Sequence, residues 1–206
     1  EAAGKTSDPL RASASVRKKR YSDLFLLTTP TDVYPLYENA CRAKWGQSLE
    51  EAQAESGMIW SNFSEVANET EGAWIHSPKT PEEITTADEN NRPISFPYTK
   101  LMVANSSVNQ GAAFIVTSLE AALAHGVPEE KLVYVGLGAH AEEVGNILAR
   151  DTYADSVSMS ETLNKALEFN GLSVSDLDAA ELYSCFPCVP KLARRVIGWP
   201  VERPMT

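Results

Sequence analysis

The chain has 206 residues, a length that fits one large domain or a compact pair of domains. Its 18 Lys and Arg residues stand against 28 Asp and Glu residues, and the net charge of −10 argues against nucleic acid or an anionic membrane as a partner. No apolar run approaches the roughly 18 residues needed to span a bilayer, and neither end looks like a signal peptide, so we expect a cytoplasmic protein. The start at Glu1 rather than Met, and the stop at Thr206 after a turn-like stretch, suggest a piece of a longer protein.

Cysteine and histidine are sparse. The three cysteines are Cys41, Cys185 and Cys188, an odd and low count that fits a reducing compartment without structural disulfides. The three histidines are widely spaced and form no zinc pattern with the cysteines. The sequence therefore predicts no metal site.

The first residues of the chain have the pattern of a loop followed by a strand. Residues 1–29 begin as a polar stretch and carry the basic run Arg17–Arg20, which we interpret as a solvated loop rather than as a cluster that steers a phosphorylated ligand. Asp23–Leu27 is apolar and short, which predicts a buried strand.

Two helices are predicted next in the chain. The first opens at Pro35 and stops near Gly46, and the second follows the capping box Ser48–Glu51. The polar, proline-rich residues 68–98 predict a long connection with one short helical turn after Thr80.

Three short apolar runs in the rest of the chain predict buried strands, and a predicted helix follows each of them. The strands are Gly111–Thr117, Leu132–Val135 and Ala179–Tyr183. The helices are Leu119–His125 with Ser118 as its cap, a helix opened by the capping box Ser158–Glu161, and a helix through Leu192 to Ile197. This alternation of strands and helices predicts an α/β fold with a mostly parallel sheet. The change in sequence pattern after the proline-rich stretch places a boundary near residue 97.

Two short motifs have chemical interpretations that we rank low. Cys185–Cys188 is a C-x-x-C between a strand and a helix, the arrangement of a redox dithiol, but it lies late in the chain and arises easily by chance. Gly136–Ala141 matches the loose G-x-G-x-x-A dinucleotide pattern before the helix-like Glu142–Arg150, but no apolar strand ending in an acid follows. We therefore interpret Gly136–Ala141 as a loop and keep the dithiol as a lower-ranked alternative.

A polar turn precedes the first of the three predicted strands. Asn105–Gln110 supplies hydroxyls and amides, and the small residues Gly111–Ala113 let the strand approach neighbouring backbone closely. Such groups suit contacts with the amide groups of a ligand, although a tight turn that satisfies its own backbone explains them equally well.

Several of these stretches together resemble the thiolase superfamily, and within it the sterol-carrier-protein-type thiolases and the thiolase-like acetyl-CoA acetyltransferases. Asn109–Ala113 is similar to the family's Asn-Asp-Gly-Ala-Ala, with Gln110 in place of Asp. Glu181–Phe186 stands where the family has Glu-x-Asn-Glu-Ala-Phe or the related His-Asp-Cys-Phe. The further similar stretches are Tyr34–Tyr37, Gly46–Glu51, Phe63–Ala67, Thr80–Ile84, Arg92–Ile94 and Tyr98–Met102.

The resemblance implies a fold of two similar α/β halves with a loop domain, of which this chain is the middle. Residues 1–29 would then be the end of the N-terminal half or a linker, and residues 30–97 the helical loop domain. Residues 98–206 would be the start of the C-terminal βαβαβ half. The resemblance also implies a homodimer or tetramer for the complete protein.

The chemistry that the resemblance implies is acyl exchange with coenzyme A, by Claisen condensation or thiolysis. Coenzyme A or acyl-CoA would be the substrate rather than a tightly bound cofactor. One cysteine takes the acyl group, and a second cysteine with a histidine moves the proton. None of the three cysteines present matches either role, so we expect these groups outside Glu1–Thr206 and the chain alone to be inactive.

The resemblance also assigns tentative site residues. Tyr183 occupies the position where the family's Asn or His helps form an oxyanion hole, and Ser184 takes that of its acidic neighbour. Ser106 takes the position of a serine that lines the pantetheine tunnel, or Ser107 if the match slips by one residue. Cys185 and the following Phe186 would pack under the site. Tyr183 fits a packed core tyrosine equally well, and a β-hydroxyacyl-CoA aldolase or a non-catalytic CoA-binding protein stays an alternative.

Overall fold

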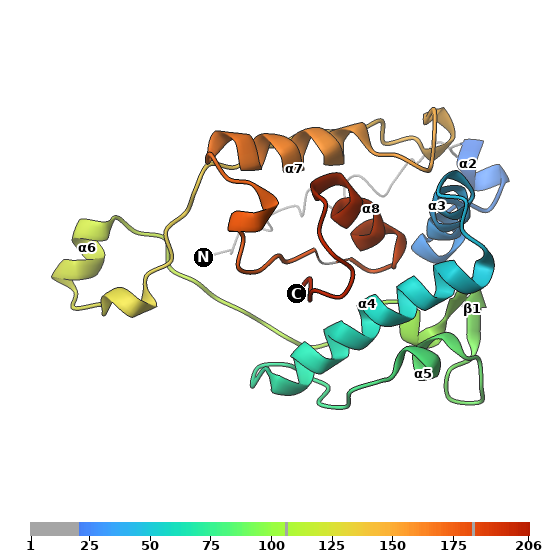
Figure 1. The fold of residues 1–206 in the computed structure, drawn as a ribbon, viewed down its shortest axis with the longest axis horizontal. Coiled ribbons are helices and arrows are strands. Elements are labelled where there is room, and N and C mark those ends of the chain that lie inside the picture. Colours follow the sequence, from blue (N-terminus) through green and yellow to red (C-terminus); the bar gives the residue numbers. More distant parts are fainter. Residues whose placement is uncertain (1–20, 106, 183) are drawn as a thin grey trace, which may run out of the picture.

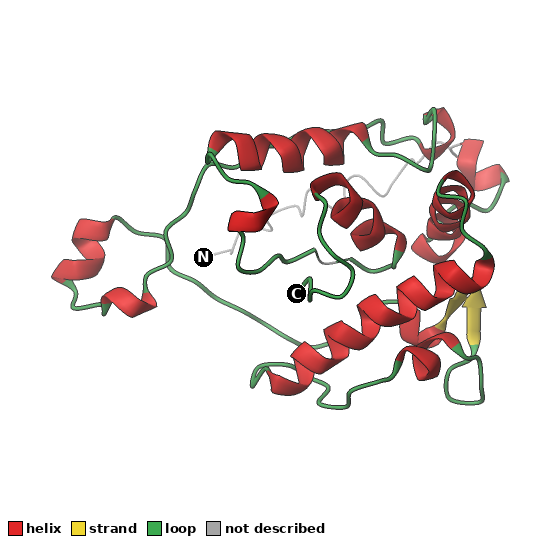
Figure 2. Cartoon of the chain, viewed as in Figure 1, coloured by secondary structure: helices red, strands yellow, loops and turns green. Residues whose placement is uncertain are grey.

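The chain folds into a mostly helical body from which an arm extends that carries one α-helix and one 3-10 turn (Figures 1 and 2). The computed structural model describes residues 21–105, 107–182 and 184–206. The α-helices are α2 (Tyr21–Leu24), α3 (Pro30–Lys44), α4 (Leu49–Glu69), α5 (Pro81–Thr85), α6 (Leu119–Ala124), α7 (Val157–Phe169) and α8 (Cys188–Ile197). The 3-10 turns are η2 (Lys100–Met102), η3 (Glu129–Lys131), η4 (Ile147–Ala149) and η5 (Val174–Asp176). Two short strands, β1 (Pro93–Ser95) and β2 (Tyr98–Thr99), pair antiparallel.

Reciprocal capping starts α4 and α5 where the sequence predicts. At α4, Ser48 Oγ accepts a hydrogen bond from the Glu51 N–H at 3.2 Å, and Glu51 Oε2 accepts from the Ser48 N–H at 2.7 Å. Thr80 and Glu83 make the same pair of bonds at the start of α5. These bonds satisfy N–H groups that have no partner within the helix, so both predicted starts are confirmed.

α3 begins at Pro30, earlier than the predicted start at Pro35. Thr29 sets this start, because its N–H and its hydroxyl both donate to the Asp32 carboxylate, at 2.8 and 2.7 Å. Proline fits the first position of a helix, where the backbone nitrogen has no helical partner. Pro35 lies inside the helix.

The predicted strand Asp23–Leu27 is wrong, since α2 occupies its first residues. Leu24, Phe25 and Leu26 are 66%, 58% and 75% exposed. These exposures do not fit the buried strand that the apolar pattern predicts.

The loop between α4 and β1 packs closely on α4. A Cβ atom placed on Gly57 would lie 2.8 Å from the carbonyl oxygen of Pro81. The missing side chain therefore lets α5 lie directly against α4. Asn91 then ties the loop to η2, because its Nδ2 donates to the carbonyl oxygen of Ile84 at 3.0 Å and its Oδ1 accepts from the Leu101 N–H at 2.9 Å.

α8 organises the core. It packs against α7 and α3, and Figure 1 shows it between α7 and α4. Three clusters of buried apolar side chains surround it. Their buried members are Ile84, Tyr98, Met102, Phe186 and Cys188 in the first, Cys41, Ala154 and Leu192 in the second, and Ile59, Trp199 and Met205 in the third.

The helices of the second half form as predicted, with one small shift. α6 and α8 match the predicted residues closely. α7 starts at Val157, because the Ser156 hydroxyl, rather than that of Ser158, accepts from the Met159 N–H at 3.0 Å.

The predicted parallel sheet does not form among the described residues. Gly111–Thr117 and Leu132–Val135 form neither helix nor strand, and no strand pairing involves them there. The segment 179–182 makes one backbone bond to the chain end, from the Leu182 N–H to the Met205 carbonyl oxygen at 2.8 Å. The structure is thus helical with a small hairpin. Within the same ranges, none of the helices combines the length and the apolar character that crossing a membrane requires.

Candidate functional site

Two of the three predicted site residues, Tyr183 and Ser106, lie outside the described residues, as does the basic run Arg17–Arg20. Ser107 is exposed, and its N–H donates to Asn105 Oδ1 at 2.9 Å. The polar turn therefore satisfies part of its own backbone, as one of the two interpretations of this stretch predicts.

A backbone hydrogen bond brings the two predicted site segments together. The Ala104 N–H donates to the carbonyl oxygen of Cys185 at 3.1 Å. Ala104 lies just before the turn that contains Ser107, and Cys185 lies two residues after Tyr183. The residues that flank the predicted pantetheine contact and the predicted oxyanion-hole position are thus neighbours in space.

The turn after Tyr183 is held by a serine and an aromatic ring. Ser184 Oγ accepts from the Phe186 N–H at 3.1 Å and donates to the Phe186 carbonyl oxygen at 2.9 Å. The Phe186 ring is 3% exposed, stacks on Tyr34 with a centroid distance of 4.3 Å, and contacts Tyr98 at 5.3 Å. Phe186 therefore packs beneath the turn, and Cys185 packs against the same cluster of buried side chains.

A buried ion pair fixes α8 directly after this turn. Lys191 Nζ donates to Glu38 Oε1 at 2.5 Å and to the Ala52 carbonyl oxygen at 2.8 Å. The Tyr98 hydroxyl donates to Glu38 Oε2 at 3.0 Å, and burial raises the pKa of Tyr98 far above its usual range. α8 is thereby joined to α3, α4 and β2, which sets the position of the turn that precedes it.

The environments of the cysteine thiols do not favour a redox-active dithiol. Cys188 is 1% exposed, and burial raises the pKa of its thiol well above the usual value. Cys41 is fully buried, and burial raises the pKa of its thiol to about 12. None of the three cysteines takes part in a disulfide. Because only the thiolate is a nucleophile, these environments argue against redox exchange at Cys185–Cys188.

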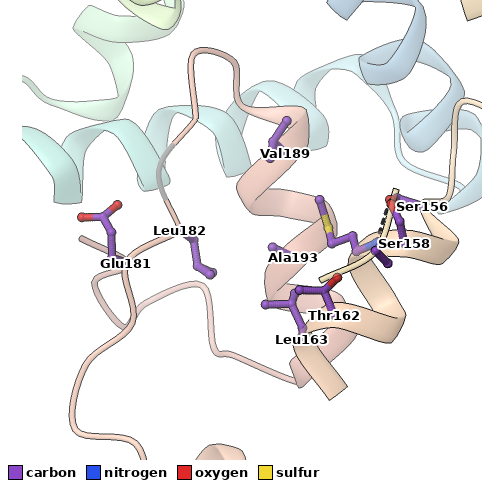
Figure 3. A pocket seen from close by; sticks show the side chains of 10 residues that line it. Ser156, Ser158, Thr162, Leu163, Glu181, Leu182, Val189 and Ala193 are labelled. Carbon is purple, nitrogen blue, oxygen red and sulfur yellow. Dashed lines mark hydrogen bonds between the residues drawn. The ribbon is translucent and has the colours of Figure 1, made fainter. Parts of the chain in front are cut away.

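A pocket of about 470 Å³ lies beside the turn, between α7, α8 and the segment that leads into Tyr183 (Figure 3). Its lining combines apolar side chains with hydroxyls and one carboxylate. The lining residues are Ala141, Ser156, Ser158, Met159, Thr162, Leu163, Glu181, Leu182, Val189 and Ala193. Glu181 Oε2 accepts from the Thr206 hydroxyl at 2.8 Å.

A second pocket of about 240 Å³ lies on the α3 side of α8 and shares Ser156, Met159 and Val189 with the first. Its polar end is an ion pair between Arg150 and Glu143. Arg150 Nη1 also donates to the Tyr37 hydroxyl at 2.7 Å, and Ser156 Oγ donates to Glu143 Oε1 at 2.6 Å.

Sequence reasoning missed this polar end. Glu143 and Arg150 lie seven residues apart in one segment, whereas Tyr37 lies 113 residues before Arg150, and no spacing pattern connects it to them. The helix-like stretch predicted over Glu142–Arg150 is only the short turn η4.

The glycine motif after residue 135 has a packing explanation. A Cβ atom on Gly136 would lie 2.6 Å from Asn170 Oδ1. The Leu137 N–H donates to that oxygen at 2.9 Å, and Asn170 Nδ2 donates back to the Leu137 carbonyl oxygen at 2.7 Å. Gly136 therefore makes room for a side chain that anchors the loop to the end of α7. This geometry supports the interpretation of Gly136–Ala141 as a loop.

Within residues 21–105, 107–182 and 184–206, no group of three or more His, Cys, Asp or Glu side chains is arranged so that it could hold a metal ion.

Comparison with solved structures identifies the class of fold. No family model and no curated protein sequence matches the chain. The crystal structure of a monomeric SCP2-thiolase-like protein type 1 from Mycobacterium smegmatis matches it with a TM-score of 0.80 and 34% sequence identity. The match covers 92% of this chain and 41% of that protein. The chain therefore carries part of a thiolase-like fold and is related to an SCP2-thiolase-like protein, which confirms the predicted resemblance.

Proposed function

We propose that the chain is part of a thiolase-like acyl-CoA acyltransferase and contributes to its acyl-CoA site. The observation that carries the proposal is the hydrogen bond from the Ala104 N–H to the Cys185 carbonyl oxygen, because it joins the two segments that the resemblance assigns to substrate binding. The 34% identity to an SCP2-thiolase-like protein supports the same class. Because the chain spans 41% of that protein, the activity of a complete protein is itself a proposal.

The proposed roles follow the chemistry of each side chain. Tyr183 donates a hydrogen bond through its hydroxyl to the oxyanion that forms during condensation or thiolysis. Ser106, or Ser107, contacts the amide groups of the pantetheine arm. Coenzyme A is a substrate that binds and leaves. The nucleophilic cysteine and the proton-moving cysteine and histidine lie outside these 206 residues.

Acetoacetyl-CoA thiolysis tests the proposal on the complete protein encoded around this chain. Tyr183→Phe removes one hydroxyl and keeps the ring, and we expect a loss of about 10²–10³ in kcat, the scale measured for one oxyanion-hole donor. Ser77→Ala is the control, because it also removes one hydroxyl, from an exposed residue in the loop between α4 and α5. Undiminished thiolysis by Tyr183→Phe would show that Tyr183 has no role in the reaction.

Two alternatives on the same scaffold are a β-hydroxyacyl-CoA aldolase and a non-catalytic CoA-binding protein. An aldolase cleaves β-hydroxyacyl-CoA without thiolysis of acetoacetyl-CoA, and a binder takes CoA without turning over either substrate. Assaying both reactions and CoA binding on one preparation separates the three.

Location and assembly are also proposals. We propose a cytoplasmic protein, which accords with the finding that no described helix crosses a membrane. The resemblance predicts a homodimer or tetramer, whereas the solved relative is described as monomeric, which favours a monomer here. Light scattering coupled to gel filtration decides between these states.

A further inference from the structure

The pocket of about 240 Å³ between α3 and α8 combines an apolar wall with a polar end. Val33 of α3, Met159 of α7 and Leu192 of α8 belong to the apolar wall. Tyr34 and Tyr37, both on α3, bring two phenol hydroxyls to the polar end. An apolar lining with a small number of polar groups is the usual composition of a site for a small molecule.

Contacts with α3 fix the segment that precedes α7 and forms the polar end of this pocket. Cys41 Sγ donates to the Tyr153 carbonyl oxygen at 3.6 Å. The Tyr153 ring meets the Tyr37 ring edge-on, with a centroid distance of 5.2 Å. Asp155 forms an ion pair with Lys44. The fold itself therefore fixes the walls of the pocket.

The charged side chains that line the pocket already have partners of opposite charge. Glu143 forms an ion pair with Arg150 and accepts a hydrogen bond from Ser156 Oγ at 2.6 Å. Asp155 is paired with Lys44. A charged ligand group would find no counter-charge of its own here, and taking a charge out of water without one costs free energy. A neutral ligand therefore fits this pocket better than an anion or a cation.

The two phenol hydroxyls still have protons to donate. The Tyr37 hydroxyl accepts from Arg150 Nη1 at 2.7 Å, and its own proton has no acceptor within the described ranges. The Tyr34 hydroxyl makes no hydrogen bond to any residue that the structure describes. Burial raises the pKa of both hydroxyls above its usual value, so both carry their protons at neutral pH.

These donors and the size of the pocket define the ligand. The rings of Tyr34 and Tyr37 are neighbours, with centroids 6.0 Å apart, and a carbonyl oxygen has two lone pairs with which to accept from two donors. A cavity of about 150 Å³ accommodates benzene, so a pocket of about 240 Å³ suits a ligand of about ten non-hydrogen atoms.

We propose that this pocket binds a neutral, mostly apolar ligand whose carbonyl oxygen accepts hydrogen bonds from the Tyr34 and Tyr37 hydroxyls. The apolar part of the ligand lies against Val33, Met159 and Leu192. The site does not depend on coenzyme A. A free ketone or ester and an acyl group that ends in a ketone share this chemistry.

Calorimetric titration of octan-2-one into the complete encoded protein tests the proposal, because this neutral ketone has about the right size. We expect saturable binding with a Kd below about 1 mM. Octanoate and octylamine carry a negative and a positive charge on a chain of the same length, and each should bind at least about tenfold more weakly. No saturable binding of octan-2-one, or equal affinity for octanoate, would overturn the proposal without any variant.

Variants locate the site within the protein. Tyr34→Phe combined with Tyr37→Phe removes both donors and should weaken octan-2-one binding about tenfold. Val33→Trp fills the apolar wall and should abolish binding, whereas Ser77→Trp, at an exposed residue in the loop between α4 and α5, should leave it unchanged. Protection of the α4 amides from hydrogen exchange verifies that each variant is folded. Wild-type affinity in a folded Val33→Trp variant would overturn the assignment to this pocket.

Competition distinguishes the two sources of the ligand. Displacement of octan-2-one by 7-oxooctanoyl-CoA, but not by coenzyme A, would support the site and assign its ligand to an acyl group. No displacement would support it as a site for a free ketone or ester. Octan-2-one binding in a protein that binds no coenzyme A would contradict the proposed function while supporting this pocket.

Discussion

Lys191 and Glu38 form an ion pair in which neither side chain reaches solvent, with residue exposures of 0% and 1%. The pair joins α8 to α3 just beyond the turn that follows Tyr183. Each charge is compensated twice, since Lys191 also donates to the Ala52 carbonyl oxygen and Glu38 also accepts from the Tyr98 hydroxyl. A charge pair removed from water is tolerated only with this degree of compensation.

Lys191→Met should therefore destabilise the fold by about 3–5 kcal/mol, because it leaves the Glu38 carboxylate buried without its cation. Denaturant unfolding measures the loss. Lys191→Met combined with Glu38→Leu should recover much of it, since no charge then remains in the core. Lys165→Met, which breaks an exposed pair with Glu168, should scarcely change stability. A loss below about 1 kcal/mol for Lys191→Met would contradict the buried-pair interpretation.

Glu55 makes the free energy of unfolding depend on pH in the acidic range. Burial alone would raise the pKa of Glu55, but hydrogen bonds from Arg195, Gln47 and Arg194 outweigh it and lower the pKa from 4.5 to about 2. A carboxylate with a lowered pKa in the folded state stabilises the protein above its unfolded pKa, and this contribution is lost as pH falls from about 4.5 to 2.

Glu55→Gln should flatten the plot of unfolding free energy against pH across that window. The pH-dependent part that disappears should be at most about 3 kcal/mol. Glu65→Gln, at an exposed carboxylate, is the matched control and should keep the wild-type slope. An unchanged slope for Glu55→Gln would show that the Arg194–Glu55–Arg195 cluster does not couple to folding.

Cys188 should resist alkylation in the folded protein. Its burial and raised thiol pKa predict labelling by iodoacetamide at pH 8 at least about a hundredfold slower than in the unfolded chain. Mass spectrometry of the labelled peptides measures both rates. Rapid labelling of Cys188, or a reversible disulfide to Cys185 in the native protein, would revive the dithiol alternative.

Gly57 should tolerate no side chain. In Gly57→Ala the new Cβ would meet the Pro81 backbone at 2.8 Å, so α5 must move away from α4. We expect a loss of about 1–3 kcal/mol, measured as a shift of the unfolding midpoint. Gly72→Ala is the control, because a Cβ there meets nothing within 4 Å. Equal stability of the two variants would disprove the close approach.

The sequence predicts the elements whose determinants are local. The capping boxes at Ser48 and Thr80 depend on residues three positions apart, and both helices start where these pairs predict. A strand also needs hydrogen-bonding partners from distant parts of the chain. The apolar pattern of residues 111–117 predicts a strand, but the described residues contain no partner strand for it. The polar end of the second pocket depends on Arg150 meeting Tyr37, which lies 113 residues earlier in the chain, and no local pattern shows this contact.

The sequence predicts which segments belong to the candidate site but not the contacts between them. The motif resemblance picked the stretches around Ser107 and Cys185, and the Ala104–Cys185 hydrogen bond shows that they are neighbours. The roles of Tyr183 and Ser106 stay predictions, since both lie outside the described residues.

Calorimetric titration of coenzyme A into the complete encoded protein tests most directly whether these two segments form an acyl-CoA site. We predict saturable binding with one site per chain, weakened at least about tenfold by a bulky change in the polar turn, Ser106→Trp or Ser107→Trp. Ser175→Trp, in the exposed turn η5, should bind as the wild type does. No heat of binding at millimolar coenzyme A, in a protein whose α4 amides are protected from exchange, would contradict the proposed function.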